Sequence, residues 1–264
     1  MAIRKPLFVI PLDLGSIATG NETAGYPASN LNRHKAIGLT WKSTGNSNVW
    51  ARGDFGSDKP VNFMALVAAN ALAGTQVRLR LGTSQAEVDG AAPYDSAAQT
   101  FISPSITRED GLYHSHLEIG SVQTYRWWRI DITGHTGDFQ AADLVLGQSF
   151  SPSRYYNFDY ERGIEDMGDL NISRWGVFDE DPGVIFRTIG FTLGWQTEAE
   201  FEDLFRPMLE KLGKRGVLYL VFDPEATAYR QSKTYMGVMR KPPVARGIRK
   251  AATYTQDYEM LSMI

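Results

Sequence analysis

The four histidines of this 264-residue sequence are its first candidates for chemistry: His34, His114, His116 and His135. A neutral imidazole binds transition metals and exchanges protons near neutral pH. His114 and His116 are separated by one residue, so an extended chain would place both imidazoles on one face, together with Glu118. Two imidazoles and a carboxylate suit zinc and similar ions. Because no second ligand motif accompanies the pair, the favoured interpretation is an exposed strand beside a loop, without a metal.

Other catalytic patterns give no better starting point. The sequence contains no cysteine, which excludes a disulfide scaffold, a cysteine-ligated metal and a cysteine nucleophile. It also lacks the nucleophile turn Gly-x-Ser-x-Gly, a phosphate-binding loop and the calcium-binding loop Asp-x-Asp-x-Asp-Gly. Residues 213–216 are typical of a helix-to-strand turn, and residues 54–56 match a kinase tripeptide by chance, because no other kinase motif is present.

Carboxylates are abundant in the second half of the sequence, and any two of them could pair as a general acid and base. They are Glu161, Glu165, Asp166, Asp169 and the run at residues 179–181. Their turn-like surroundings favour solvated loops. A hydrolase that uses scattered carboxylates is therefore the least favoured functional hypothesis.

One segment, residues 240–250, holds five basic residues and no acidic one, and Pro242 and Pro243 keep it extended. Contact with nucleic acid or with an acidic partner is one interpretation. The favoured one is a solvated loop between strands, because no aromatic residues are interleaved with the charges.

Overall charge and hydropathy limit the classes of partner that the sequence predicts. Twenty-seven basic and 30 acidic side chains give a formal net charge of -3, which favours neither nucleic acid nor an anionic membrane as a partner. Pro6 and Pro11 interrupt the apolar stretch that a signal peptide would need. The longest apolar-looking stretch, residues 61–74, is shorter than a membrane-spanning helix. No catalytic, cofactor-binding or metal-binding residue and no cofactor is assigned.

The residue pattern of the first half differs from that of the second, and the change falls near residues 147–154. This predicts two domains, at residues 1–148 and 149–264. In the first, β-rich runs alternate with turns, a spacing typical of an antiparallel β-sandwich. Residues 77–81 and 125–133 alternate strictly, and the second run places Trp128, Ile130 and Ile132 on one face. Other strands are expected within residues 1–14 and at residues 49–55 and 62–69, with a turn at residues 57–60.

The second half combines strands with one helix signal, which predicts an α+β domain. Thr197 and Glu200 form a capping-box pattern, and apolar side chains recur at helical spacing as far as Leu212. Pro207 should kink or split this helix, and Gly213 fits its C-cap. Strands are expected at residues 183–195, 217–222, 233–240 and 252–262, and alternation leaves open which face of the last one is buried.

Over about residues 20–148, the first half resembles the discoidin-like jelly rolls, the C-type domains of coagulation factors 5 and 8. The order of five segments carries the resemblance: residues 28–31, 41–43, 49–56, 77–82 and 125–132. Phe55 replaces the usual leucine, and the disulfide that brackets many members is missing. The resemblance implies a jelly-roll sandwich, and members of the family often hold glycans in loops at one end of it.

The second half resembles the C-terminal part of tail and baseplate proteins of tailed bacteriophages. The matching segments are residues 155–159, 198–212, 217–224, 235–239 and a closing strand that ends at residues 258–260. This order is similar to distal tail and tube-like domains, whose subunits form rings by pairing strands between neighbours. In most distal tail proteins the ring domain comes first, whereas here it would come second.

These resemblances lead to the main hypothesis, a non-enzymatic structural component of a phage tail tip or baseplate. It would form a homo-oligomeric ring, link the tail tube to the baseplate or fibres, and contact tube, hub, fibre or tape-measure proteins. The implied location is the virion tail, after assembly in the host bacterial cytoplasm. Six aromatic residues are candidate interface anchors, although most are expected to fill the cores: Trp127, Trp128, Trp175, Trp195, Tyr155 and Tyr156.

The alternative hypothesis is a carbohydrate-binding module or receptor-adhesion protein that holds a host glycan in loops of the sandwich. The candidate loops are residues 20–32 and 90–107. Tyr26, Tyr94 and Phe101 are the aromatic residues available there to stack on a sugar.

Overall fold

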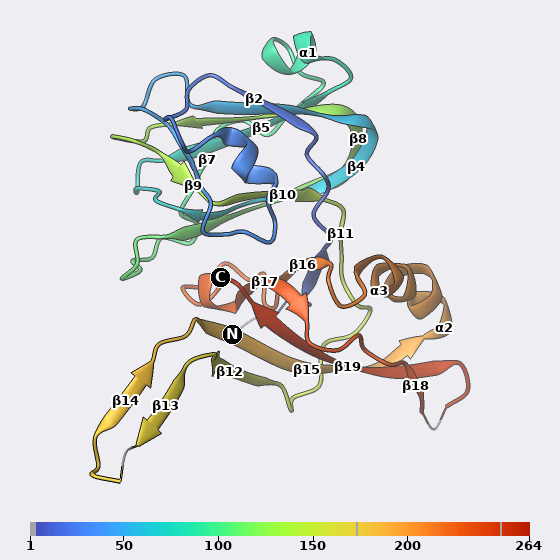
Figure 1. Ribbon diagram of the computed structural model, residues 1–264. Coiled ribbons are helices and arrows are strands. Elements are labelled where there is room, and N and C mark those ends of the chain that lie inside the picture. Colours follow the sequence, from blue (N-terminus) through green and yellow to red (C-terminus); the bar gives the residue numbers. More distant parts are fainter. Residues whose placement is uncertain (1–3, 173, 249) are drawn as a thin grey trace.

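Antiparallel β-sheets are the main secondary structure of the computed structural model, which describes residues 4–172, 174–248 and 250–264. Within these residues, a seven-stranded sheet belongs to the first half, and an eight-stranded sheet is built mainly by the second. The first sheet lies above the second in Figure 1. The mainly β fold class predicted from the sequence is confirmed.

Two long strands build the β-sandwich of the first half, because each bends through both layers (Figure 1). They are β4 (Trp50–Ala69) and β8 (Tyr113–Thr133), and they pair antiparallel with each other near both ends. The turn predicted at residues 57–60 is wrong, because β4 continues through this stretch. The register of the two strands shifts here, and Gly56 adopts a φ of 78°. An irregularity with a positive-φ glycine bends a strand without ending it.

Other strands attach to this pair and complete the two layers. One layer gains β2 (Ser16–Thr19) and β5 (Gln76–Gly82), and the other gains β10 (Asp143–Gly147). The smaller elements are β6 (Tyr94–Asp95) and β7 (Gln99–Thr100) on β5, the separate pair β3 (Trp41–Lys42) and β9 (Gln140–Ala141), helix α1 (Gln85–Asp89) and a 3-10 helix at Ala28–Asn32. The strand predicted at residues 62–69 is confirmed, and the alternating run at residues 77–81 lies within β5.

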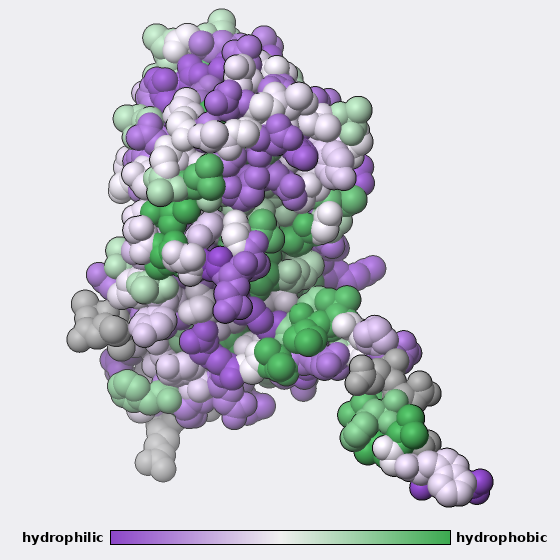
Figure 2. All heavy atoms as spheres, turned by 90° about the vertical axis from the view of Figure 1, so that its left-hand side faces the viewer, coloured by the Kyte–Doolittle hydropathy of each residue, from purple (hydrophilic) through white to green (hydrophobic). Residues whose placement is uncertain are grey.

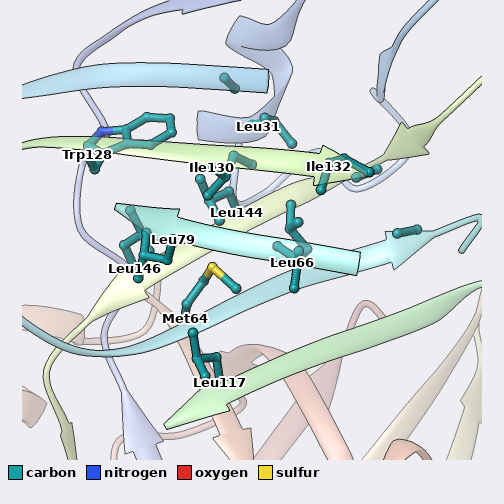
Figure 3. Packing of buried hydrophobic residues seen from close by; sticks show 14 of the residues in the cluster. Leu31, Met64, Leu66, Leu79, Leu117, Trp128, Ile130, Ile132, Leu144 and Leu146 are labelled. Carbon is teal, nitrogen blue, oxygen red and sulfur yellow. The ribbon is translucent and has the colours of Figure 1, made fainter. Parts of the chain in front are cut away.

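Period-2 alternation fills the core of the sandwich as predicted. Trp128, Ile130 and Ile132 of β8 are buried, and Leu79 of β5 belongs to the same cluster (Figure 3). Nε1 of Trp128 donates a hydrogen bond of 3.1 Å to the backbone oxygen of Leu14, so the buried indole keeps a partner. Burying each large apolar side chain stabilises the fold by about 1.5–3 kcal/mol relative to leaving it exposed.

The eight-stranded sheet contains a strand from the N-terminal part of the chain. Its order is β11-β1-β16-β17-β19-β15-β12, and β1 (Leu7–Val9) lies between β11 (Ser149–Phe150) and β16 (Val217–Val221). The other elements are β12 (Glu161–Asp166), β15 (Ile185–Thr197), a 3-10 helix at Gln231–Lys233, β17 (Thr234–Met239), β19 (Thr253–Ser262) and β18 (Arg246–Gly247), which pairs with β19. The division at residue 148 thus separates β1 from its sheet, and the domain boundary itself stays a prediction.

Strand β16 is apolar on both faces because both faces are covered. Leu218 and Leu220 belong to the cluster of buried residues that includes helix α3 (Arg206–Leu212). Tyr219 faces the sandwich, where its ring lies 5.6 Å from that of Phe63 of β4, measured between centroids. A strand buried on both faces has a continuous apolar run instead of alternation. The two halves therefore share a hydrophobic interface.

The predicted helix consists of three consecutive pieces: α2 (Glu198–Glu200), a π-helical turn (Phe201–Phe205) and α3. The side chain of Thr197 accepts a hydrogen bond of 3.2 Å from the backbone N–H of Glu200, as the capping pattern predicts. Pro207 lies in the first turn of α3, directly after the π-helical turn, so the predicted split is confirmed. Gly213 ends the helix with a φ of 50°. Within the described ranges, no helix is long and apolar enough to cross a membrane.

A hairpin of β13 (Asp169–Ile172) and β14 (Phe178–Asp181) projects from the body as an arm (Figures 1 and 2). Large apolar side chains are exposed on it, among them Leu170, Ile172 and Phe178. The prediction that the nearby carboxylates lie in solvated loops is wrong, because they belong to strands: Glu161, Glu165 and Asp166 to β12, and Asp169 to β13. The sequence obscured these strands because polar residues dominate strands that are exposed.

Candidate functional site

His114 lies on a strand as predicted, but the strand is buried between the two halves and not exposed. Its Nδ1 accepts a hydrogen bond of 3.2 Å from the backbone N–H of Ala68. The side chain of Gln231, from the second half, bonds both the N–H and the C=O of His114 at 2.8 Å. Burial lowers the pKa of His114 to about 3. This imidazole is therefore neutral and structural.

The side chain of His116 is also buried, and its Nε2 lies 3.3 Å from Oε1 of Glu118. Arg4 donates two hydrogen bonds of 2.7 Å to the Glu118 carboxylate. Burial raises the pKa of Glu118, but the contacts with His116 and Arg4 outweigh it and lower the pKa to about 2. The arginine thus occupies the carboxylate that a metal would need. In the part of the chain that the structure describes, no group of three or more histidine, aspartate and glutamate residues could hold a metal ion.

The basic run at residues 240–250 forms the connection between β17 and β19. Arg240 pairs with Glu259 at 2.8 Å, and Arg246 pairs with Asp257 at 3.3 Å. Arg249 lies outside the described residues. Two of the cations are therefore neutralised by their own sheet.

A groove of about 1120 Å³ runs along the outside of the sandwich and reaches the second half. Its walls are the segment between β1 and β2, strand β2 itself, the bend of β4, and single residues from β8, α1 and α3. The polar and aromatic side chains that line it are Asp13, Ser16, Asn32, His34, Arg52, Asp54, the buried Phe55, Lys59, Gln85, Trp127 and Lys211.

Trp127 is the large aromatic ring of this groove. It precedes the buried Trp128, so the alternation of β8 turns its half-buried indole to the outer face of the sheet. Asp54 of β4 lies opposite it in the register. Arg126 donates two hydrogen bonds of 2.7 Å to the Asp54 carboxylate, and these bonds lower the pKa of Asp54. A charged acceptor therefore sits next to the ring.

Asp13 supplies a second fixed carboxylate. It accepts hydrogen bonds from Asn32 Nδ2 at 2.8 Å and from the backbone N–H of Gly15 at 3.0 Å. The bond from Asn32, together with that from Gly15, lowers the pKa of Asp13. Asn32 in turn accepts from the backbone N–H of Leu14 at 3.0 Å. These bonds hold the carboxylate in one orientation, and it is ionised at neutral pH.

The groove also holds donors that are not engaged within the protein. The side chains of Lys59, Gln85 and Lys211, and Nε1 of Trp127, donate no hydrogen bond to any residue that the structure describes. They come from four different elements that converge only in the fold. The groove thus offers fixed acceptors and free donors around one aromatic ring.

Arg52 is held at the edge of the groove by an outer-face network. Asp89 of α1 pairs with Arg52 and, at 2.7 Å, with Arg129. Both guanidinium groups stack on Trp50, with 5.2 Å from Arg52 and 4.4 Å from Arg129 to the ring centroid. Asp131 lies 2.7 Å from Arg129 on the other side. This network makes the wall of the groove rigid.

The aromatic residues predicted for the sandwich loops do not come together. Phe101 is buried in the core, with its ring centroid 6.2 Å from that of Phe139. Tyr94 is half-buried, and burial raises its pKa, whereas Tyr26 is exposed. None of the three lines the groove. Trp127 was not assigned to a glycan site, although the alternation that buries Trp128 already indicated that it faces outward.

The other candidate interface anchors lie in different environments. Trp128 fills the core, and Tyr156 stacks on Phe222 with 4.1 Å between ring centroids. Tyr155, Trp175 and Trp195 have exposed fractions of 52%, 77% and 48%.

No protein-family model and no curated protein matches this sequence. Among solved structures, it is similar to chitosan-binding module 1 from a chitosanase/glucanase of Paenibacillus sp. IK-5, with 16% identity, 52% of this chain and 97% of that chain covered, and a TM-score of 0.37. It is also similar to a fucose-binding module of Streptococcus pneumoniae (8% identity, 52% and 95% covered, TM-score 0.39). A third is the family 32 carbohydrate-binding module of NanJ from C. perfringens in complex with galactose (15% identity, 55% and 99% covered, TM-score 0.39).

These comparisons correct the main functional hypothesis. The matched structures just described are carbohydrate-binding modules and not tail or baseplate proteins. The prediction of a structural tail component that assembles as a ring is contradicted by this finding, and we withdraw it. The resemblance of the first half to a jelly-roll sandwich agrees with the observed topology.

Proposed function

We propose that the protein binds carbohydrate and that the groove along the sandwich holds the saccharide. The exposed face of Trp127 between fixed polar groups is the observation that carries this proposal. A sugar ring has one face of C–H groups, which packs on an aromatic ring, and a rim of hydroxyls, which need donors and acceptors at once. Binding sites that combine apolar contact with a few placed polar groups meet both demands.

The polar groups of the groove match the rim of a sugar. Asp13 and Asp54 accept hydrogen bonds, and their orientations are already fixed by Asn32 and Arg126. Lys59, Gln85 and Lys211 are left to donate. Hydrogen bonds to charged groups are stronger than neutral ones, and fixed partners lose little entropy on binding.

The size of the groove favours an oligosaccharide over a single sugar. Its volume, about 1120 Å³, exceeds the roughly 300–1000 Å³ of sites that enclose one small molecule. The groove also extends from the sandwich to the second half of the chain, since both Gln85 of α1 and Lys211 of α3 line it. We therefore assign it to several consecutive sugar rings.

A glycan array probed with the full chain, followed by calorimetry on each hit, tests the proposal. Trp127→Ala should weaken binding at least about tenfold, because truncating a central aromatic contact costs about 2 kcal/mol or more. Trp195→Ala, which removes an exposed tryptophan outside the groove, is the matched control and should bind normally. The saccharide should be recovered unchanged after incubation. An array without a hit, or equal affinity of the wild type and Trp127→Ala, would overturn the proposal.

A further inference from the structure

A second cleft, of about 580 Å³, lies between the two halves and shares no residue with the groove. One wall is the sandwich loop at residues 105–108. The other is formed by Ala228, Tyr229, Gln231, Ser232 and Arg187 of β15. Any molecule bound here touches both halves of the protein at once.

Arg187 is a partly buried cation that forms no ion pair with any Asp or Glu side chain in the part of the chain that the structure describes. Its guanidinium donates to the backbone oxygens of Ser232 and, at 3.1 Å, of Ile264, and it lies 4.7 Å from the ring centroid of Tyr235. Burial lowers the pKa of Arg187, and the neighbouring cations Arg108 and Arg162 lower it further, against the opposing effect of Tyr235. The Arg187 guanidinium is therefore held by two main-chain oxygens and an aromatic ring, and not by an acidic side chain of the described residues.

Two further guanidinium groups add to this charge. Arg108 lines the cleft and shares two hydrogen bonds, of 3.1 and 2.7 Å, with Asp110. Arg162 donates to the hydroxyl of Tyr235 at 2.8 Å and to the backbone oxygen of Ser232 at 2.7 Å. Arg108 and Arg162 thus lie near enough to Arg187 to lower its pKa, and among these three arginines only Arg108 has an ion pair with a carboxylate side chain in the described residues.

Hydroxyl groups surround these cations. Ser105 and Thr107 are exposed on the sandwich side, and Tyr229 is exposed on the other. Hydroxyl and guanidinium donors are the groups that bind oxyanions, because both donate hydrogen bonds and arginine adds charge and a planar fork of donors.

We propose that this cleft binds a compact oxyanion, that is a carboxylate, sulfate or phosphate group, through Arg108, Arg187 and the hydroxyls of Ser105 and Thr107. The group is either free in solution or carried by an acidic saccharide. Because the two arginines come from different halves, the bound anion would bridge the halves and resist their separation. This proposal does not depend on the groove being a saccharide site.

The test uses the full chain and three probes: sodium sulfate, inorganic phosphate and galacturonate. Galactose is the neutral control for galacturonate. Sodium chloride at equal ionic strength is the control for salt effects. At least one oxyanion should bind saturably in calorimetry and should raise Tm with its concentration, because a ligand of the folded state stabilises it. Binding of sulfate or phosphate identifies a free anion, and binding of galacturonate alone identifies an acidic saccharide. Equal effects of all probes and of sodium chloride would overturn the proposal.

Variants separate this site from the groove. Arg108→Gln should weaken anion binding about tenfold, and Thr107→Glu should abolish it by adding a negative charge at an exposed position that leaves the fold intact. Arg78→Gln is the matched control, since Arg78 is also paired with one aspartate but lies outside the cleft. Trp127→Ala should retain the anion affinity, so that failure of the saccharide proposal and failure of this one are distinguishable. Equal losses in Arg78→Gln and Arg108→Gln would refute the assignment.

Discussion

Gln231 and His114, 117 residues apart, are joined by two hydrogen bonds of 2.8 Å. The amide of Gln231 accepts from the backbone N–H of His114 and donates to its backbone oxygen. It thereby takes the place of a neighbouring strand at this point of β8. Both residues are buried, so this contact joins the sandwich to the second half of the chain.

Replacing Gln231 with alanine should lower the free energy of unfolding by about 2–4 kcal/mol. The substitution leaves a buried N–H and a buried C=O without partners, and each such group costs about 1–3 kcal/mol. Urea unfolding measures the effect. Gln123→Ala is the control, because the exposed bonds of its side chain in the described residues go to the nearby Ser121, and its change should stay within about 0.5 kcal/mol. A Gln231→Ala protein as stable as the control would refute the role of this contact.

Stability should fall as the pH is lowered from about 6.5, because His114 stays neutral in the folded state. Its folded pKa, about 3, lies below the value of 6.5 in the unfolded chain, so only the unfolded chain takes up the proton in this window. The loss is about 1.4 kcal/mol per pH unit for one proton. Arg108 and Arg187 oppose protonation of His114, and Asp110 favours it.

The comparison of wild type with His114→Asn isolates this contribution. Asparagine offers an oxygen to the N–H of Ala68 but takes up no proton. Urea unfolding at pH 7 and pH 5 should show a smaller loss of stability in the variant. Identical losses in both proteins would show that His114 does not control the acid dependence.

Lys59→Ala should weaken saccharide binding about tenfold without lowering stability. Lys59 lies in the groove and donates to no described residue, so its loss removes only a bond to the ligand, and a hydrogen bond to a charged group contributes about 1.5–3 kcal/mol. Calorimetry with the best array hit measures the effect. Lys35→Ala, an exposed lysine outside the groove, should bind as the wild type does. A normal affinity of Lys59→Ala would exclude this lysine from the site.

Thr197→Ala should destabilise the protein by about 1 kcal/mol, because the side chain of Thr197 caps the helix that begins at Glu198. Thermal or urea unfolding reports the change. Thr197→Ser keeps the accepting oxygen and should restore most of the stability, whereas equal losses in both variants would point to packing of the methyl group instead of capping.

Local patterns in the sequence were sufficient to predict several elements of the fold. Alternation predicted that Trp128 and Ile130 face the core, and the capping box, Pro207 and Gly213 predicted how the helix begins, divides and ends. These features depend on neighbours a few residues away, so a short window of sequence contains their causes. The turn predicted at residues 57–60 failed because a bent strand and a turn share the same residue types.

The candidate sites could be identified only from the tertiary structure. Trp127 and Lys211 are 84 positions apart in the chain and meet only because the helix packs on the sheet that covers the sandwich. The sequence predicted an exposed strand at His114 because this strand contains polar residues. In the fold, the second half of the chain packs against the strand, so the imidazole is buried and neutral.

Side-chain periodicity and backbone preferences are local, and they were enough to predict the mainly β fold, the inward face of the alternating strands and the ends of the helix. The partners of β1, the burial of the polar groups and the positions of the groove and the cleft became known from the packed fold. Contacts between distant segments depend on the shapes and areas of whole faces, and no local pattern specifies them.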